Sequence, residues 1–294
     1  LNQARYGFQG IGTQTAALGA GGYFYPGGAR SESESYNGTS WTTAGSLNTA
    51  RSRLQAGVLG TQTAGLGTGG YNASLISAAE HFNGSTWTSP TSFPGSYSSA
   101  YTNFMSDIAI NTSNLHVAVG FVSGTFNGSY GTYPIYSTSS DFGSTWTTPG
   151  IINSGPMTVQ GIAVNSSGLF VAVGYNFQNS TIIPKYMTST DGSTWSTPTS
   201  FSSNYFNPQR IAVNSSGLFI AVGSSGGQAV YFKSSDGINW TNPIFIDLNG
   251  NNKQSLQSII YDGTKFVSVG ASNYSSTSTS YPYFTTSLSL SGYY

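Results

Sequence analysis

The chain has 294 residues, no cysteine, and a formal net charge of zero with only 6% charged residues, whereas an average soluble domain has about 25%. The missing cysteines exclude disulfides, thiol catalysis and cysteine-ligated metals. The lack of surplus Lys and Arg argues against a nucleic-acid partner, and no run is apolar enough for membrane insertion.

The first third of the chain contains two copies of one pattern. Residues 1–5 match 47–51, and the Gly-rich run 12–22 matches 60–70. Each copy then reaches a glutamate before an aromatic residue, an Asn-Gly turn and a tryptophan. These strand and turn signals predict a hairpin followed by two further strands in each copy.

The rest of the chain contains a second repeated pattern. Residues 161–174 are nearly identical to 210–223, and weaker copies occupy 107–120 and 258–270. Each copy has two short β-branched runs around a turn, which predicts a hairpin. The runs are almost continuously apolar, so we expect strands that are buried on both faces.

Three of these hairpins lead to a Ser-x-Asp turn that ends in tryptophan, at 139–146, 189–195 and 234–240. Together with Trp41 and Trp87, all five tryptophans hold one repeat position. We therefore expect them to lie buried between adjacent sheets, with a fourth strand starting near each. Aspartates in such turns accept hydrogen bonds from the backbone amides of their own turn. We expect this of Asp141, Asp191 and Asp236.

Four-stranded antiparallel units at this spacing predict propeller blades. The predicted fold class is all-β, a single six-bladed β-propeller over residues 1–294. The blades are approximately 1–46, 47–93, 94–149, 150–198, 199–243 and 244–294. The sixth is degenerate, with Tyr293 at the tryptophan position, which we interpret as a short outer strand or a truncated piece of a longer polypeptide.

These motifs resemble two known repeat families. The pattern Ser-x-Asp-x-Gly-x-Thr-Trp at 139–146, with shorter later copies, resembles the Asp-box (BNR) repeat of sialidases and is assigned to blades 3 to 6. Blades 1 and 2 look like Kelch-type repeats, and their repeated sequences are similar to those of repeat proteins encoded by marine bacteria and tailed phages. The resemblance implies a propeller in which each Asp box is a structural turn, and it says little about function.

The residues themselves argue against catalysis. The sialidase family uses an arginine triad, a Tyr–Glu pair and an acid, but Arg5 and Arg51 are equivalent repeat positions and only Arg210 lies in the Asp-box blades. A glycosidase needs two carboxylates at a defined separation. Once the turn aspartates and the repeat glutamates are set aside, the remaining acids are Glu32, Asp107 and Asp247. We therefore predict that the chain is not an enzyme.

We expect neither a cofactor nor a bound metal. The two histidines, His81 and His116, fall in predicted strands of different blades. The polar loop 247–251 lacks the closing acid of a calcium site.

Loop length separates two faces of the predicted blades. The tight turns share one face, and the long connections, rich in Tyr and Phe, share the other. Exposed aromatic rings beside amides and hydroxyls suit sugars or protein partners. The alternative is that about half of these rings fill grooves between blades. The aromatic residues assigned to ligand binding are Tyr23, Tyr71, Phe121, Tyr175, Phe177, Tyr205 and Phe206.

A glutamine stands just before the first strand of three blades. We expect Gln160, Gln209 and Gln257, with Asp107 and Arg210, to form a polar ring at the mouth of the channel. Amides both donate and accept, so such a ring suits sugar hydroxyls or water. The alternative left open is that each glutamine ties its loop to the backbone of a neighbouring blade.

The functional hypothesis from sequence is a non-catalytic adhesion or receptor-binding propeller, extracellular or on a virion, whose partner is a cell-surface glycan or receptor. The alternative is a structural decoration or filament subunit that binds other virion or filament subunits through the aromatic face, with homo-oligomers possible. A glycosidase-like enzyme comes third.

Overall fold

The computed structural model describes residues 1–13, 15–52, 56–76, 79–89, 102–126, 129–152, 155–178, 181–201, 206–246, 254–272 and 281–283. The chain divides into two compact units. Unit 1 comprises residues 1–131 and 135–151, and unit 2 comprises residues 132–134 and 152–294. Each unit is described by itself.

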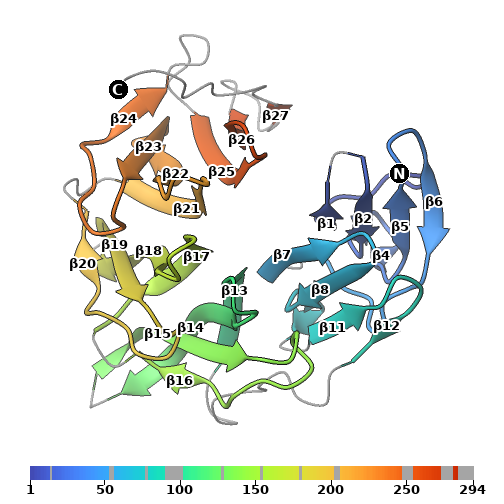
Figure 1. Ribbon diagram of the computed structural model, residues 1–294, viewed down its shortest axis with the longest axis horizontal. Coiled ribbons are helices and arrows are strands. Elements are labelled where there is room, and N and C mark those ends of the chain that lie inside the picture. The colour runs from blue at the N-terminus through green and yellow to red at the C-terminus, as the bar shows by residue number, and fades with distance from the viewer. Residues whose placement is uncertain are drawn as a thin grey trace. The chain divides into compact units, whose positions relative to one another are not determined.

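Unit 1 is built from antiparallel four-stranded sheets that follow one another along the chain (Figure 1). The first contains β1 (Gln9–Gly12), β2 (Ala17–Ala20), β5 (Ser33–Tyr36) and β6 (Trp41–Ala44). The second contains β7 (Ala56–Thr61), β8 (Ala64–Thr68), β11 (Ala79–Phe82) and β12 (Trp87–Thr88). The third contains β13 (Thr102–Ile110), β14 (His116–Phe126), β15 (Ser129–Ser139) and β16 (Gly150–Ile151).

Two small hairpins interrupt the first two sheets at the same place. Between the second and third strands of the first sheet lie β3 (Tyr23–Phe24) and β4 (Gly28–Ala29). The second sheet has β9 (Tyr71–Asn72) and β10 (Ser74–Leu75) at the equivalent connection. We expected both segments to be long loops, but each of these connections in unit 1 contains a short hairpin.

Unit 2 continues the same meander. One sheet contains β17 (Thr158–Val164), β18 (Phe170–Gln178), β19 (Thr181–Ser189) and β20 (Thr199–Ser200). The next contains β21 (Phe206–Val213), β22 (Phe219–Ser225), β23 (Gln228–Ser234) and β24 (Ile244–Ile246). In the last, the described strands are β25 (Gln254–Tyr261), β26 (Phe266–Ser272) and β27 (Tyr281–Tyr283).

The all-β expectation is confirmed for the part of the chain that the structure describes, which contains no helix. Correspondingly, a search of these residues finds no helix long and apolar enough to cross a bilayer. The successive antiparallel sheets have the form of propeller blades.

The outer strands of the three sheets that contain Ser-x-Asp turns start later than expected. Strands β16, β20 and β24 begin four residues after Trp146, Trp195 and Trp240. The indole nitrogens of the first two donate to the carbonyls of Gly143 and Gly192, at 3.0 and 3.1 Å, so these tryptophans close the turn instead of opening a strand. The fourth strands consequently run two or three residues past the blade limits drawn from the sequence.

The core of unit 2 is aromatic and β-branched. Phe206, Phe219 and Phe232 are fully buried, and the rings of Phe206 and Phe232 lie 4.5 Å apart between centroids. The assignment of Phe206 to ligand binding is therefore wrong, because strand β21 turns this ring into the core. Trp240 packs on Phe201 of the preceding segment, with centroids 5.0 Å apart.

Burial of the tryptophans is only partly as expected. Trp87 and Trp146 are buried, whereas Trp41, Trp195 and Trp240 are half-buried. Tyr293 lies outside the described residues. The indole nitrogen of Trp87 donates to Ser33 Oγ of the first sheet at 2.9 Å, so this ring joins neighbouring sheets of unit 1.

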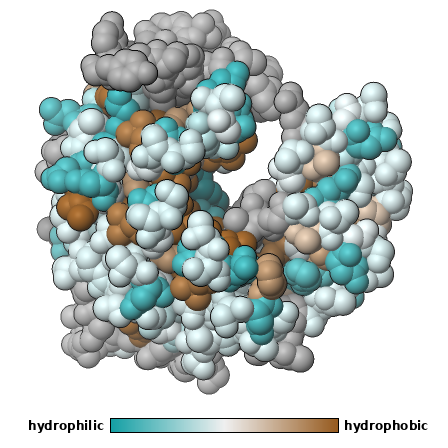
Figure 2. Space-filling view, viewed as in Figure 1, coloured by the Kyte–Doolittle hydropathy of each residue, from teal (hydrophilic) through white to brown (hydrophobic). Residues whose placement is uncertain are grey.

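The surface in Figure 2 is mostly pale or teal, with apolar residues in scattered brown patches. This agrees with a chain whose surface is built from Gly, Ser, Thr and Asn instead of charged residues. Several large apolar side chains are nevertheless exposed, including Tyr25, Tyr130 and Phe177.

Candidate functional site

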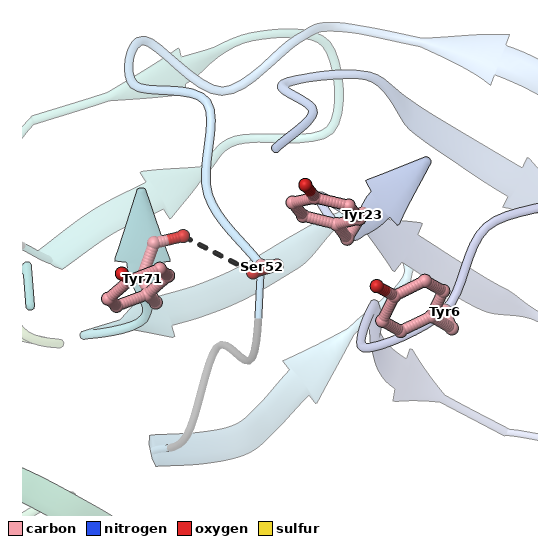
Figure 3. A pocket seen from close by; sticks show the side chains of 4 residues that line it. All are labelled: Tyr6, Tyr23, Ser52 and Tyr71. Carbon is pink, nitrogen blue, oxygen red and sulfur yellow. Dashed lines mark hydrogen bonds between the residues drawn. The ribbon is translucent and has the colours of Figure 1, made fainter. Parts of the chain in front are cut away.

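A pocket of about 340 Å³ opens on unit 1, within the usual size range of small-molecule sites. Its lining residues are Tyr6, Tyr23, Ser52 and Tyr71 (Figure 3). Tyr6 is 57% exposed and Tyr71 is 43% exposed, whereas Ser52 is buried. The pocket thus presents accessible aromatic rings around a small buried hydroxyl residue.

Two repeat-equivalent backbone bridges build the pocket. In the first sheet's connection, Tyr6 and Tyr23 exchange backbone hydrogen bonds of 3.1 and 2.7 Å. In the second, Ser52 and Tyr71 exchange bonds of 2.9 and 2.8 Å, and Ser52 Oγ donates to the Tyr71 carbonyl at 3.3 Å. The small hairpins β3–β4 and β9–β10 therefore hold Tyr23 and Tyr71 against the chain entering each sheet.

The opening results from one difference between the two repeats. Tyr6 and Ser52 each follow the arginine of the matching segments 1–5 and 47–51. In the first repeat, the rings of Tyr6 and Tyr23 lie 5.4 Å apart between centroids. In the second repeat the smaller Ser52 leaves the space beside Tyr71 unfilled.

Gly70 sets how closely the second hairpin approaches. Its φ is +103°, a conformation that favours glycine, and a Cβ here would lie 2.9 Å from the Ser52 carbonyl oxygen. Gly22, before Tyr23, has a similar φ of +111°, and a Cβ there would lie 3.2 Å from the Tyr6 carbonyl oxygen, so the glycine directly before Tyr23 and Tyr71 is a structural requirement of each bridge.

Buried ion pairs lie beneath this site. Arg5 pairs with Glu34 at 3.0 Å and Arg51 with Glu80 at 2.5 Å, and all four side chains are 5% exposed or less. Burial lowers the pKa of the Arg51 guanidinium, and the charge of Glu80 opposes that shift.

The same glutamates also hold the start of each repeat. The backbone amides of Asn2 and Asn48 donate to Glu34 Oε2 and Glu80 Oε2, each at 2.6 Å. The side-chain amides of the two asparagines reach the carbonyls of Trp41 and Trp87. The repeated Leu-Asn-x-Ala-Arg and Glu positions therefore form a structural core, and their carboxylates are fully occupied.

The three Ser-x-Asp turns have the predicted hydrogen bonds. Asp191 Oδ1 accepts from the amides of Ser193 and Thr194 at 2.8 and 2.6 Å. Asp236 Oδ1 accepts in the same way at 2.9 and 2.7 Å, and Asp141 Oδ1 accepts from the Thr145 amide at 2.8 Å. These carboxylates stabilise their turns and are not available for chemistry.

Hydrogen bonds also shift the acidity of these groups. The Thr145 hydroxyl and amide lower the pKa of Asp141 to about 2. Backbone amides hold the pKa of Asp191 and Asp236 well below the ordinary value. Asn37 and Asn83 form the equivalent turns in unit 1, where each amide oxygen accepts two backbone N–H groups.

The aromatic residues assigned from the sequence are dispersed. The pocket contains Tyr23 and Tyr71, two of the seven residues assigned. Phe177 is 63% exposed on β18, and Phe121 and Tyr175 are half-buried in their strands. Tyr205 lies outside the described residues.

The glutamines of the expected polar ring occupy a repeated backbone feature. The ladders of the first strands shift register at Gln160, Gln209 and Gln257, as well as at Ser106. Each is therefore the extra residue of a β-bulge, which bends the strand and leaves a residue outside the ladder. The three glutamines and Ser106 therefore share one backbone position, and the bulge itself does not require glutamine.

Arg210 bonds to the backbone of two of these bulges. Its Nη1 donates to the carbonyls of Gln160 and Gln209, at 2.6 and 2.8 Å, and so ties neighbouring first strands of unit 2 together. This geometry favours a backbone tie over ligand binding for Arg210. Asp107 lies beside the bulge of β13 in unit 1, where its Oδ1 accepts from the Ile108 amide at 3.0 Å.

Sequence reasoning missed Tyr6 and Ser52. Both follow the repeated arginine, so aligning the two repeats one residue further would have shown the exchange of a large ring for a small side chain. The pocket depends on that asymmetry between otherwise similar repeats.

The described residues contain no cluster of three or more His, Asp or Glu side chains suited to a metal ion. Burial lowers the pKa of His116, whose Nδ1 lies 2.9 Å from the Asn114 carbonyl oxygen. Three described acids are in neither a Ser-x-Asp turn nor a buried pair: Glu32, with its side chain 42% exposed, Asp107, and Asp262, whose Oδ1 accepts from the Thr264 and Lys265 amides of a hairpin turn.

A scan against protein-family models and a search of curated proteins found no match. Among solved structures, a glycosyl hydrolase from Bacteroides ovatus is 17% identical, with a TM-score of 0.43 and coverage of 59% of this chain and 61% of the other. A Hadza microbial sialidase is 12% identical, with a TM-score of 0.47 and coverage of 91% and 53%.

A third solved structure comes from the GH130 family of mannoside phosphorylases. This family contains glycoside hydrolases that target β-1,2 mannosidic linkages in Candida mannan. The third structure is 17% identical, with a TM-score of 0.41 and coverage of 59% of this chain and 61% of the other. This chain therefore spans between 53% and 61% of the three chains that it resembles.

This comparison corrects the functional expectation from sequence. We expected a non-catalytic adhesion module and no enzyme, but the solved structures that it found are carbohydrate-active enzymes. At 12–17% identity the resemblance concerns chain trace, and no residue role, substrate or reaction is carried over from it.

Proposed function

We propose that the chain is the sugar-binding propeller of a glycoside-processing enzyme, and that a sugar ring binds in the pocket of Tyr6, Tyr23, Ser52 and Tyr71. The observation that carries the proposal is the pocket itself, with tyrosine rings exposed around a volume of about 340 Å³. We propose sugar binding for this chain and glycoside processing for the whole protein that contains it.

The chemistry of the pocket suits a carbohydrate. Tyrosine combines an apolar ring with a hydroxyl that both donates and accepts hydrogen bonds. A sugar ring has the complementary surface, since its C–H face is apolar and its edge carries hydroxyls. Ligand sites of this size usually combine aromatic walls with a few polar groups.

Hydrolysis of a glycosidic bond uses two carboxyl groups. In the part of unit 1 that the structure describes, the carboxylates outside box turns and buried pairs are Glu32 and Asp107. We assign these as the candidate acid and base or nucleophile. Asp247, the other acid left by the sequence analysis, lies outside the described residues.

Two finer features belong to the same proposal. The six successive sheets support a six-bladed closed propeller, since closure protects sheet edges; small-angle X-ray scattering distinguishes a closed ring from an open arrangement. The uncharged polar surface supports an extracellular or virion-surface location.

The test is a glycan array followed by calorimetric titration of the best oligosaccharide. We expect Tyr71→Ala to weaken binding by about tenfold or more, roughly 1.4 kcal/mol, because the stacking ring is lost. Tyr130→Ala is the matched control, since Tyr130 is 80% exposed and does not line the pocket.

Catalysis is tested separately with aryl glycosides of the sugars found on the array. We expect hydrolysis by the wild type and its loss in Glu32→Gln and in Asp107→Asn, with sugar binding retained in both. Absence of glycan binding on the array would refute the proposed site. Binding without hydrolysis by the full-length protein would refute the enzymatic part.

A further inference from the structure

The arginines next to the pocket are paired before any ligand arrives. Arg5 directly precedes Tyr6, and Arg51 directly precedes Ser52. Their side chains point to Glu34 and Glu80, with the guanidinium groups 1% and 0% exposed. Neither cation is therefore presented to a ligand in the pocket.

Arg30, a further described arginine of unit 1, is also engaged. Its Nη2 donates to Gln3 Oε1 at 3.1 Å, its Nη1 lies 3.7 Å from Glu32, and its guanidinium carbon lies 5.3 Å from the centre of the Phe24 ring. Each described arginine of unit 1 is thus balanced by a glutamate. Arg53 lies outside the described residues.

The remaining recognition groups of the pocket are uncharged. They are the phenol rings and hydroxyls of Tyr6, Tyr23 and Tyr71, and the structure gives these three hydroxyls no hydrogen-bond partner among the described residues. The face of an aromatic ring has negative electrostatic potential. An anionic sugar would therefore approach ring faces that repel it, and it would lose hydration without gaining a cation from the described residues.

We infer that the pocket selects neutral sugar rings and discriminates against sugars that carry a carboxylate, such as sialic or uronic acids. This inference rests on the proposed function and adds the substrate class. The discrimination comes from the two buried Arg–Glu pairs, which neutralise the described arginines adjacent to the pocket residues, and from a wall of three tyrosines and one serine.

The repeat supplies a specific way to close the pocket. Ser52→Tyr gives the second repeat the residue that the first repeat has at the equivalent position, and its ring would occupy the space beside Tyr71. Tyr71→Ala removes the wall instead. Thermal melting of both variants shows whether each is folded, and Tyr71→Ala remains informative if Ser52→Tyr does not fold.

The experiment is a titration with matched probes: lactose with sialyllactose, and galactose and mannose oligomers with galacturonic acid oligomers. We expect a neutral probe to bind, and we expect the affinity of its acidic counterpart to be lower by at least about tenfold. Binding of the neutral probe should not change between low and high salt, since no ion pair is formed. Ser52→Tyr and Tyr71→Ala should both weaken binding of the neutral probe by about tenfold or more.

The possible outcomes separate the two ideas. Equal or tighter binding of an acidic probe that Tyr71→Ala abolishes would overturn the neutral-sugar inference while leaving the sugar site in place; Arg53→Ala would then show whether Arg53 supplies the cation. No binding of either class of probe would overturn the proposed function and this inference together.

Discussion

At the scale of single residues, the same Asx-type turn recurs in five sheets, with either aspartate or asparagine as its hydrogen-bond acceptor. The later sheets use Asp141, Asp191 and Asp236, whereas the first two sheets use Asn37 and Asn83. The backbone donors are alike, so the acceptor oxygen is what the fold requires. The negative charge adds acid sensitivity.

That sensitivity has a defined sign. The pKa of Asp141 is lowered from 3.8 to about 2, and those of Asp191 and Asp236 are lowered further. A carboxylate whose pKa is lower in the folded state stabilises the fold when the pH is above its ordinary pKa. This contribution is lost as the pH falls from about 4 through about 2.

We therefore expect the triple variant Asp141→Asn, Asp191→Asn and Asp236→Asn to melt at a temperature that depends less on pH below about 4 than that of the wild type. Circular dichroism melts across this range measure the effect. An unchanged acid dependence would show that other groups control it.

The buried ion pairs give a second residue-scale prediction. Removing one partner of a buried pair leaves an uncompensated charge and costs about 3–5 kcal/mol, whereas an exposed pair contributes about 0–1 kcal/mol. We expect Glu80→Ala to destabilise unit 1 strongly and Glu32→Ala hardly at all, because the side chain of Glu80 is 0% exposed and that of Glu32 is 42% exposed. Denaturant unfolding checks the difference, and equal effects would contradict it.

The residue-scale interpretation from sequence was sound where a local pattern determines the structure. The hydrogen bonds of the Ser-x-Asp turns follow from a short local pattern, so those of Asp141, Asp191 and Asp236 were predicted correctly. The environment of Phe206 depends on which face of β21 meets the core, and the start of a strand does not reveal that. Tyr6 and Ser52 acquire their role only through bridges to distant hairpins.

At the scale of elements, the first hairpin of each later sheet combines a bulge with a glycine on the facing strand. Gly174, Gly223 and Gly270 lie within the second strands of the three sheets of unit 2, and a Cβ on each would lie 2.0 Å or less from a carbonyl oxygen of the first strand. The sequence pattern predicted the hairpins but ended them at these glycines, whereas each strand continues past its glycine. The bulges were not visible in the sequence because they depend on register.

This geometry makes a steric prediction. Gly174→Ala would place its Cβ 2.0 Å from the Thr158 carbonyl oxygen, which is backbone and must shift. We expect a loss of about 1–3 kcal/mol, the usual range for overpacking. Gly10→Ala is the control, since a Cβ there meets nothing within 4 Å. Chemical denaturation of both variants measures the effect, and a Gly174→Ala protein as stable as the control would refute the clash.

At the scale of the whole molecule, repetition and its interruption have different roles. Repetition predicted the all-β meander and the approximate sheet limits, because sheets of the same repeat pattern share their turns. The candidate site appears where two repeats differ, at Tyr6 and Ser52. Internal similarity therefore indicates architecture, and local departures from it indicate where a ligand can bind.

The central claim is that a sugar ring binds between the tyrosines of unit 1. The most direct measurement is a crystal structure of the chain with the oligosaccharide that binds most tightly on the array. We expect a sugar ring stacked on Tyr71, with its hydroxyls bonded to the phenols of Tyr6 or Tyr23. A bound sugar located elsewhere, with the Tyr6–Tyr71 pocket empty, would contradict the account.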